Sequence, residues 1–220
     1  MRKGWLSIAA AMLTMPIAGA ASAASCTTGS VASFTTVGFS CNVGNVLFSN
    51  IGVNAIANGI EASVILGNFT PFSVGNEFGL SLNFSAFTGT APGGTTDLAW
   101  TFNASALPGF LLSDVFMSLS GNASGTGGIV ANETLSNGVS LSLNGPGTTT
   151  ANFTPIALLG VIKDQFNFSG PAGFATTSIL QNAFSVSPVP LPGALALMGS
   201  ALAGGAVIMR RRRKQVAVPA

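Results

Sequence analysis

The stretch Phe78-Gly79-Leu80-Ser81-Leu82-Asn83-Phe84-Ser85-Ala86 decides the fold class, because apolar residues alternate with small or polar ones along its whole length. Successive side chains of a β-strand point to opposite faces of the sheet. One face of this strand therefore carries the apolar members, which are Phe78, Leu80, Leu82, Phe84 and Ala86. A strand of this kind has one face in a core and one face in water, which is typical of antiparallel sheets.

The same alternation recurs along the chain between signals for turns. It appears in Val115/Met117/Leu119, in Val139/Leu141/Leu143 and in Phe166/Phe168. Asn137-Gly138 separates residues 133–136 from residues 139–143 and predicts a hairpin with a type I′ turn. Loops rich in Gly and Pro are expected at 91–94, 125–128 and 144–147.

These short strands without intervening helices predict an antiparallel β-sandwich. A closed barrel or a solenoid stays open as an alternative, although inspection finds no fixed-period repeat. Residues 51–66 have mixed apolar spacing and could contain a short helix.

Charge is scarce and unevenly placed. Charged residues make up 6% of the chain, against about 25% in a soluble domain. Seven of the eight basic residues lie close to the two termini, and Lys163 is the exception. All six acids are internal, so one Lys against six carboxylates leaves the central region with a net charge of −5. A nucleic-acid partner is therefore not expected, because phosphate binding needs clustered Lys and Arg.

Catalytic groups are equally scarce, since the chain contains no His and no Tyr. The usual Ser-His and Cys-His arrangements are therefore excluded. Asp114 and Asp164 could meet in space as a pair of the glycosidase type, but solvated positions suit isolated acids better. No acidic cluster has the spacing of a calcium loop, and no Gly-rich loop precedes a helix. We expect no enzyme activity, no cofactor and no metal site.

The two cysteines, Cys26 and Cys41, are expected to form one disulfide, as is usual for an exported chain with exactly two thiols. A reactive thiol pair is the alternative, but the spacing is not C-x-x-C.

Residues 1–23 have the order of a secretory signal peptide. Arg2 and Lys3 precede an apolar run, and Ala21 and Ala23 supply small residues at the cleavage positions. The mature chain would then begin near Ala24, after passage through the secretion translocon. An uncleaved membrane helix is the alternative.

Residues 188–214 have three parts in a fixed order. Val189, Pro190, Leu191 and Pro192 come first, and the prolines prevent a helix from extending backwards. The run 193–209 then contains no charge and would cross a membrane as a slightly short helix. Arg210, Arg211, Arg212 and Arg213, followed by Lys214, would remain cytoplasmic. Residues 215–220 form a short tail.

This order resembles the PEP-CTERM sorting signal of Gram-negative bacteria, in the variant that has Leu191 where the name-giving motif has Glu. The resemblance implies recognition and processing of the tail by a membrane enzyme of the exosortase type. The replaced Glu and the residues after the arginines depart from the pattern. A plain C-terminal tail anchor is the alternative. The segment from residues 161–164 to residues 181–185 also resembles the final hairpin of other proteins carrying this signal.

Two functions follow for the β-sandwich domain, residues 24–187. The first, which the resemblance implies, is a non-catalytic protein of the cell envelope or extracellular matrix, held at the inner membrane during processing and then exposed on the surface or released. Extracellular polysaccharide is its candidate partner. The second is a module that binds glycan or ice, with a plain anchor. An in-register Thr ladder would favour the second function, but consecutive residues such as Thr148, Thr149 and Thr150 alternate sides.

Overall fold

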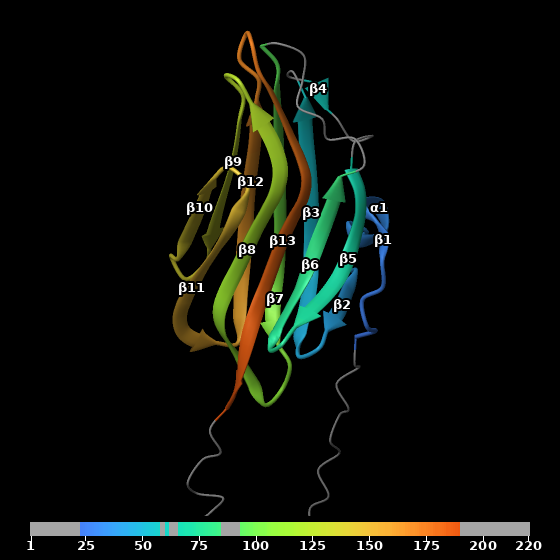
Figure 1. The fold of residues 1–220 in the computed structure, drawn as a ribbon. Coiled ribbons are helices and arrows are strands. Elements are labelled where there is room, and N and C mark those ends of the chain that lie inside the picture. The colour runs from blue at the N-terminus through green and yellow to red at the C-terminus, as the bar shows by residue number, and fades with distance from the viewer. Residues whose placement is uncertain (1–22, 58–59, 62–65, 85–92, 190–220) are drawn as a thin grey trace, which may run out of the picture.

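Two antiparallel β-sheets pack face to face and form a sandwich (Figure 1). The computed structural model describes residues 23–57, 60–61, 66–84 and 93–189. Strands make up most of this part of the chain, which confirms the mainly β prediction. The predicted signal helix and the predicted membrane segment after Val189 lie outside the described residues.

The six-stranded sheet has the order β1-β5-β6-β13-β8-β11. The bounds of its strands are β1 (Gly29–Ser30), β5 (Leu66–Val74), β6 (Glu77–Phe84), β13 (Phe174–Pro188), β8 (Phe110–Ser124) and β11 (Gly147–Ile156).

The seven-stranded sheet has the order β10-β9-β12-β7-β3-β2, and β4 pairs with β3 beside this path. A single-turn helix, α1 (Val31–Phe34), follows β1 and is capped by the Ser30 side chain. The bounds of the strands in this sheet are β10 (Ser140–Asn144), β9 (Gly128–Leu135), β12 (Leu158–Phe168), β7 (Thr95–Ala106), β3 (Val46–Ala57), β2 (Ser40–Val43) and β4 (Ile60–Glu61).

The stretch that begins at Phe78 forms β6, between β5 and β13. Leu80, Leu82 and Phe84 are buried and Phe78 packs against them, as the alternation predicts, whereas Ala86 lies outside the described residues. The intervening Gly79 is needed because a Cβ there would lie 2.2 Å from the Asn182 carbonyl oxygen. Val115, Met117, Leu119 and Leu141 are also buried, with Val139 and Leu143 packed on this core.

The hairpin at Asn137-Gly138 joins β9 to β10, but its turn is not type I′. Gly138 has a φ of +88°, and among described residues other than glycine only Asn50 has a positive φ. The Gly138 N–H donates to the Leu135 carbonyl at 2.9 Å, and the Leu135 N–H donates to Val139 at 2.8 Å. This is a three-residue loop in which a type I turn is followed by a left-handed glycine.

The apolar alternation predicts that Phe166 and Phe168 face the core, and this prediction is wrong. Within β12 the inward positions are Val161, Lys163, Gln165 and Asn167, all buried, whereas Phe168 is 38% exposed. The two rings stack on the outside with centroids 6.0 Å apart. Alternation determines which residues share a face of a strand, but it does not determine which face is buried. In β12 the more polar set faces inward because Lys163, Gln165 and Asn167 form hydrogen bonds or an ion pair between the sheets.

The predicted final hairpin is also wrong, since β12 and β13 belong to opposite sheets. Their connection crosses the end of the sandwich instead of turning back within one sheet. The short helix considered for residues 51–66 is likewise not found where the chain is described, because β3 extends to Ala57 and β5 begins at Leu66.

The disulfide between Cys26 and Cys41 is confirmed, with a Cα–Cα distance of 4.9 Å. It joins the first described segment to β2, and the Cys26 N–H also donates to the Asn42 carbonyl at 2.9 Å. The N-terminal segment is thereby fixed to the edge of the seven-stranded sheet.

Replacing both cysteines, Cys26→Ser with Cys41→Ser, is expected to lower the free energy of unfolding. The bridge has a sequence separation of 15 residues, and closing such a loop restricts the unfolded chain by about 3 kcal/mol. Urea unfolding of the double variant measures the loss. An unchanged unfolding midpoint would contradict this account of the N-terminal segment.

Candidate functional site

The outer face of the seven-stranded sheet carries a shallow groove with a volume of about 490 Å³. It lies where β3 bulges between Ser49 and Gly52. Its lining surface is mostly apolar and includes Ile162, which is 58% exposed. The polar lining residues are Asn50, Thr101, Asn103, Thr134 and Ser136.

An acid pair lies further along the same sheet, beside the stacked Phe166 and Phe168. Asp97 on β7 pairs across the sheet with Phe166, and Asp164 on β12 pairs with the nearby Ala99. Partial burial, and then the hydrogen bond with Asp164, raise the pKa of Asp97 above its ordinary value. Asp97 therefore holds its proton more tightly than an isolated aspartate would.

The predicted meeting of Asp114 with Asp164 does not occur. Asp114 is on β8 and Asp164 is on β12, in opposite sheets. Both side chains point outward, because their neighbours Val115 and Lys163 face the interior. Asp114 instead accepts a hydrogen bond from the Ser185 N–H at 2.9 Å.

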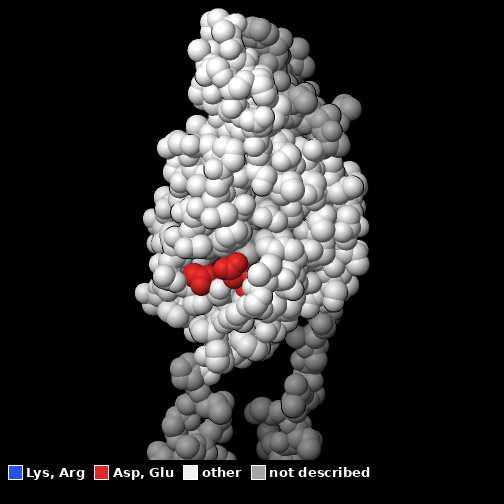
Figure 2. Space-filling view, in the orientation of Figure 1, with Lys and Arg blue, Asp and Glu red and all other residues white. Residues whose placement is uncertain are grey.

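A second acidic patch lies on the outer face of the six-stranded sheet. Burial, and then the charge of Asp114, raise the pKa of Glu77. Figure 2 shows acidic atoms gathered low on this face, surrounded by uncharged atoms. Thr148 and Thr150 on β11 pair with Ser118 and Phe116 of β8, so the threonines do not continue across the sheet as a ladder.

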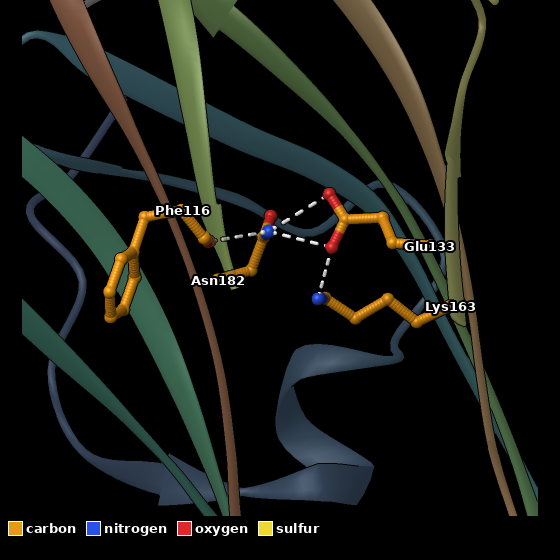
Figure 3. Close-up of polar contacts among 4 residues, drawn as sticks. All are labelled: Phe116, Glu133, Lys163 and Asn182. Atoms are coloured by element: carbon orange, nitrogen blue, oxygen red, sulfur yellow. Dashed lines mark hydrogen bonds and ion pairs between the residues drawn. The ribbon is translucent and has the colours of Figure 1, made fainter. Parts of the chain in front are cut away.

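Between the sheets, Glu133 and Lys163 form a buried ion pair. Glu133 on β9 lies directly opposite Lys163 on β12, and their side chains are 0% and 1% exposed. The Lys163 Nζ donates to the Glu133 Oε2 (Figure 3). Both residues occupy positions where the alternation of their strands faces the core.

Asn182, on β13 of the opposite sheet, completes this cluster. Its Nδ2 donates to the Glu133 Oε1 at 3.0 Å and to the Glu133 Oε2 at 2.9 Å. The same nitrogen donates to the Phe116 carbonyl at 3.0 Å, which fixes the amide from its own sheet. The Asn182 Oδ1 is buried and has no hydrogen-bond partner among the described residues. Figure 3 shows Lys163 and Asn182 both pointing at the Glu133 carboxylate.

The surroundings of this cluster are aromatic and apolar. Trp100, wholly buried, lies opposite Lys163 on β7, and the Lys163 Nζ is 5.8 Å from its ring centroid. Burial lowers the pKa of Lys163, and the charge and hydrogen bond of Glu133 oppose that effect. The ammonium form therefore loses its proton more easily than it would in water.

Further polar residues continue along the inner face of β12. The Gln165 Nε2 donates to the Asn167 Oδ1 at 2.6 Å, and the Thr177 Oγ1 donates to the same oxygen at 2.8 Å. Within the described part of the chain, three side-chain atoms of this buried group have no hydrogen-bond partner, namely the Thr96 Oγ1, the Gln165 Oε1 and the Asn167 Nδ2.

Sequence reasoning missed Glu133, Lys163 and Asn182 as a group. A usable signal was present, because Lys163 is the one basic residue far from the termini. It also shares its strand face with Val161, just as Glu133 shares its face with Leu135 and Ala131. A charge within an apolar alternation predicts a buried partner of opposite charge. Asn182 could not be found in this way, since it comes from the other sheet.

Of the predicted sorting motif, only Val189 is described. It is exposed, and its N–H donates to the Gly109 carbonyl at 2.9 Å. Ala23 of the predicted cleavage site is the first described residue. The remaining predicted residues, Ala21, Pro190, Leu191, Pro192, Arg210, Arg211, Arg212 and Arg213, lie outside the described part of the chain.

Among the described residues, no three His, Cys, Asp or Glu side chains lie close enough together to hold a metal ion. The same part of the chain contains no helix of the length and apolar character needed to cross a membrane.

No family model matches the sequence, and no curated protein matches it. Among solved structures, the chain is similar to a family two carbohydrate esterase from Cellvibrio japonicus, with a TM-score of 0.21 and 10% sequence identity. The similarity covers 64% of this chain and 36% of the esterase chain, so this chain spans little more than a third of that protein. Agreement at this level assigns neither a family nor an activity.

Asp97→Asn is expected to stabilise the protein slightly at pH 7. A raised carboxyl pKa means that the folded protein binds the proton more tightly than the unfolded chain does. Ionisation of Asp97 therefore destabilises the folded protein. This destabilisation disappears as the pH falls toward about 4. Solvent screens these partly exposed carboxylates, which limits the gain to about 0.2–0.5 kcal/mol. Thermal unfolding of the wild type and the variant at both pH values measures this gain in stability. A variant less stable at pH 7, with no dependence on pH, would contradict the prediction.

Proposed function

We propose that this protein is a non-catalytic component of the cell envelope or extracellular matrix, delivered by an N-terminal signal peptide and a C-terminal sorting signal of the PEP-CTERM type. The secretion translocon exports the chain, the tail holds it at the inner membrane, and an exosortase-type enzyme processes it. The domain then remains on the cell surface or is released, with extracellular polysaccharide as its partner.

The observation that carries this proposal is the order of the last segment: Val189-Pro190-Leu191-Pro192, an uncharged run and four arginines. Its position relative to the domain supports the proposal. Strand β13 ends at Pro188, directly before the motif, and Val189 is exposed, so an enzyme can reach the chain there. The Cys26–Cys41 disulfide is compatible with an oxidising compartment outside the cytoplasm.

The arrangement of the chain ends also suits a tethered domain. The first described residues and the end of β13 leave the sandwich at the same end (Figure 1). A tail held in the membrane would therefore leave the opposite end and both outer faces of the sheets open to the surroundings.

Processing is tested by mass spectrometry of the mature C-terminus after cell fractionation. The mature chain is expected to end near Pro192 in the surface or released fraction. Changing Arg210 to Arg213 together to Ala is expected to stop processing and to leave unprocessed precursor, because the basic cluster fixes the cytoplasmic side of the tail. An intact Ala220 in every wild-type fraction would favour a plain tail anchor instead.

A second candidate function, glycan binding, is favoured by the outer face of the seven-stranded sheet. The stacked Phe166 and Phe168 offer apolar ring surface beside the Asp97–Asp164 pair. The neighbouring groove has a mostly apolar lining that also contains hydroxyl and amide groups. Sugars present apolar C–H faces and polar edges, and this combination matches both.

Phe168→Ala is expected to weaken binding to the cell's own extracellular polysaccharide about tenfold, as loss of one stacked ring costs roughly 1.4 kcal/mol. Affinity electrophoresis in gels containing that polysaccharide measures the change. Phe174→Ala, which removes an exposed ring from the other sheet, serves as the matched control and should bind like wild type. Equal migration of all three proteins with and without polysaccharide would remove this function.

A further inference from the structure

The Glu133–Lys163–Asn182 cluster contains the three groups that an amide-forming reaction requires. The Lys163 amine is a nucleophile, the Asn182 carboxamide has an electrophilic carbon, and the Glu133 carboxylate can carry protons between them. The Lys163 Nζ and the Asn182 Nδ2 both donate to the same atom, the Glu133 Oε2. Two nitrogens bound to one oxygen lie within about 6 Å of each other, which places the Lys163 Nζ near the carboxamide of Asn182.

The cluster is also buried and fixed in position. All three side chains are almost fully buried. Glu133 and Lys163 are held opposite each other by strand register, and Asn182 is held by its bond to the Phe116 carbonyl. Reactants fixed in this way reach effective concentrations of about 10⁵–10⁸ M. No described residue donates to the Asn182 Oδ1, so this carbonyl oxygen can accept a proton during attack.

We propose that Lys163 and Asn182 become joined by an intramolecular isopeptide bond, formed in the folded protein with Glu133 as the proton carrier. The bond would tie β12 of one sheet to β13 of the other. It is a self-modification and needs no cofactor.

The reaction balances with the groups present. The Lys163 ammonium passes one proton to the Glu133 Oε2, and the neutral Nζ attacks the Asn182 Cγ. The Nζ–Cγ bond forms, the Cγ–Nδ2 bond breaks, and a second proton moves from the Nζ through Glu133 to the departing Nδ2. Ammonia leaves, one hydrogen stays on the new amide, and Glu133 retains the first proton. No electrons are transferred to or from an outside reagent.

Two physical observations favour reaction over a lasting ion pair. Burial lowers the pKa of Lys163, so the neutral amine needed for attack is accessible. A buried ion pair also carries a large desolvation cost. Reaction replaces the Lys163 and Glu133 charges by a neutral amide and a neutral carboxylic acid, so that cost disappears. Attack on Glu133 itself is disfavoured because a carboxylate carbon is a poor electrophile.

The intact mass of the full chain, after its termini have been identified by peptide mapping, tests the proposal. The mass should be lower than that of the linear chain with one disulfide by one ammonia, about 17 Da. Trypsin gives a second readout, because Lys163 is the one basic residue between Lys3 and Arg210. Acylated Lys163 resists trypsin, so the denatured, reduced protein should remain uncut there.

Glu133→Gln removes the proton carrier with little change in shape. This variant should keep the full linear mass and should be cut by trypsin after Lys163 once it is denatured. Glu77→Gln is the matched control, since it makes the same chemical change on the outer face of the other sheet and should still lose ammonia.

A wild-type chain with full linear mass that trypsin cuts after Lys163 would overturn the proposal. If Glu133→Gln forms the bond as completely as wild type, the role of Glu133 is wrong. The wild-type result decides whether the bond exists even if that variant does not fold. An Asp-N digest distinguishes the bond from a succinimide formed within the chain, which also loses one ammonia: cleavage before Asp164 should leave the two fragments covalently joined through Lys163.

Discussion

The burial of Lys163 is the constraint on which the arrangement of both sheets depends. An amine in a dry core must have a partner of opposite charge, and β9 supplies Glu133 directly beside it. The carboxylate then requires donors for its remaining lone pairs, and Asn182 reaches it from β13. The charge of Lys163 thus fixes the register of β9 against β12 and the position of β13 in the opposite sheet.

The burial of Lys163 also determines which side chains of β12 lie on the outer face of the seven-stranded sheet. With Lys163 pointing inward, the strand period of two also turns Gln165 and Asn167 inward. The alternate residues of the strand therefore point outward, namely Ile162, Asp164, Phe166 and Phe168. The acid pair and the exposed aromatic stack on the outer face are therefore consequences of the interior. A shift of one residue in β12 would bury two phenylalanines but expose the lysine and leave Glu133 as an unpaired charge in the core.

Apolar alternation predicted the fold class because it reports burial directly, as in Leu80 and Leu82 of β6. The disulfide followed from the number of cysteines in a chain with export features. Alternation failed at β12, where the inward set contains Lys, Gln and Asn and only tertiary contacts make burial favourable. It also did not reveal that Lys163 and Asn182 belong to opposite sheets, and the final hairpin was expected only from a resemblance to other proteins carrying the sorting signal. The Asn-Gly signal gave the hairpin correctly, whereas the turn type depended on the backbone of Asn137.

The position of Asn182 along β13 has a mechanical consequence. A pull on the tail after Pro188 would peel β13 from β6 and β8 starting at its C-terminal end, breaking hydrogen bonds one after another. Peeling would reach Asn182 after a short stretch, at the point where β13 meets the opposite sheet. With a covalent link there, further extension would have to rupture a chemical bond, so a tethered domain could withstand shear in flowing water even though each of its hydrogen bonds is weak.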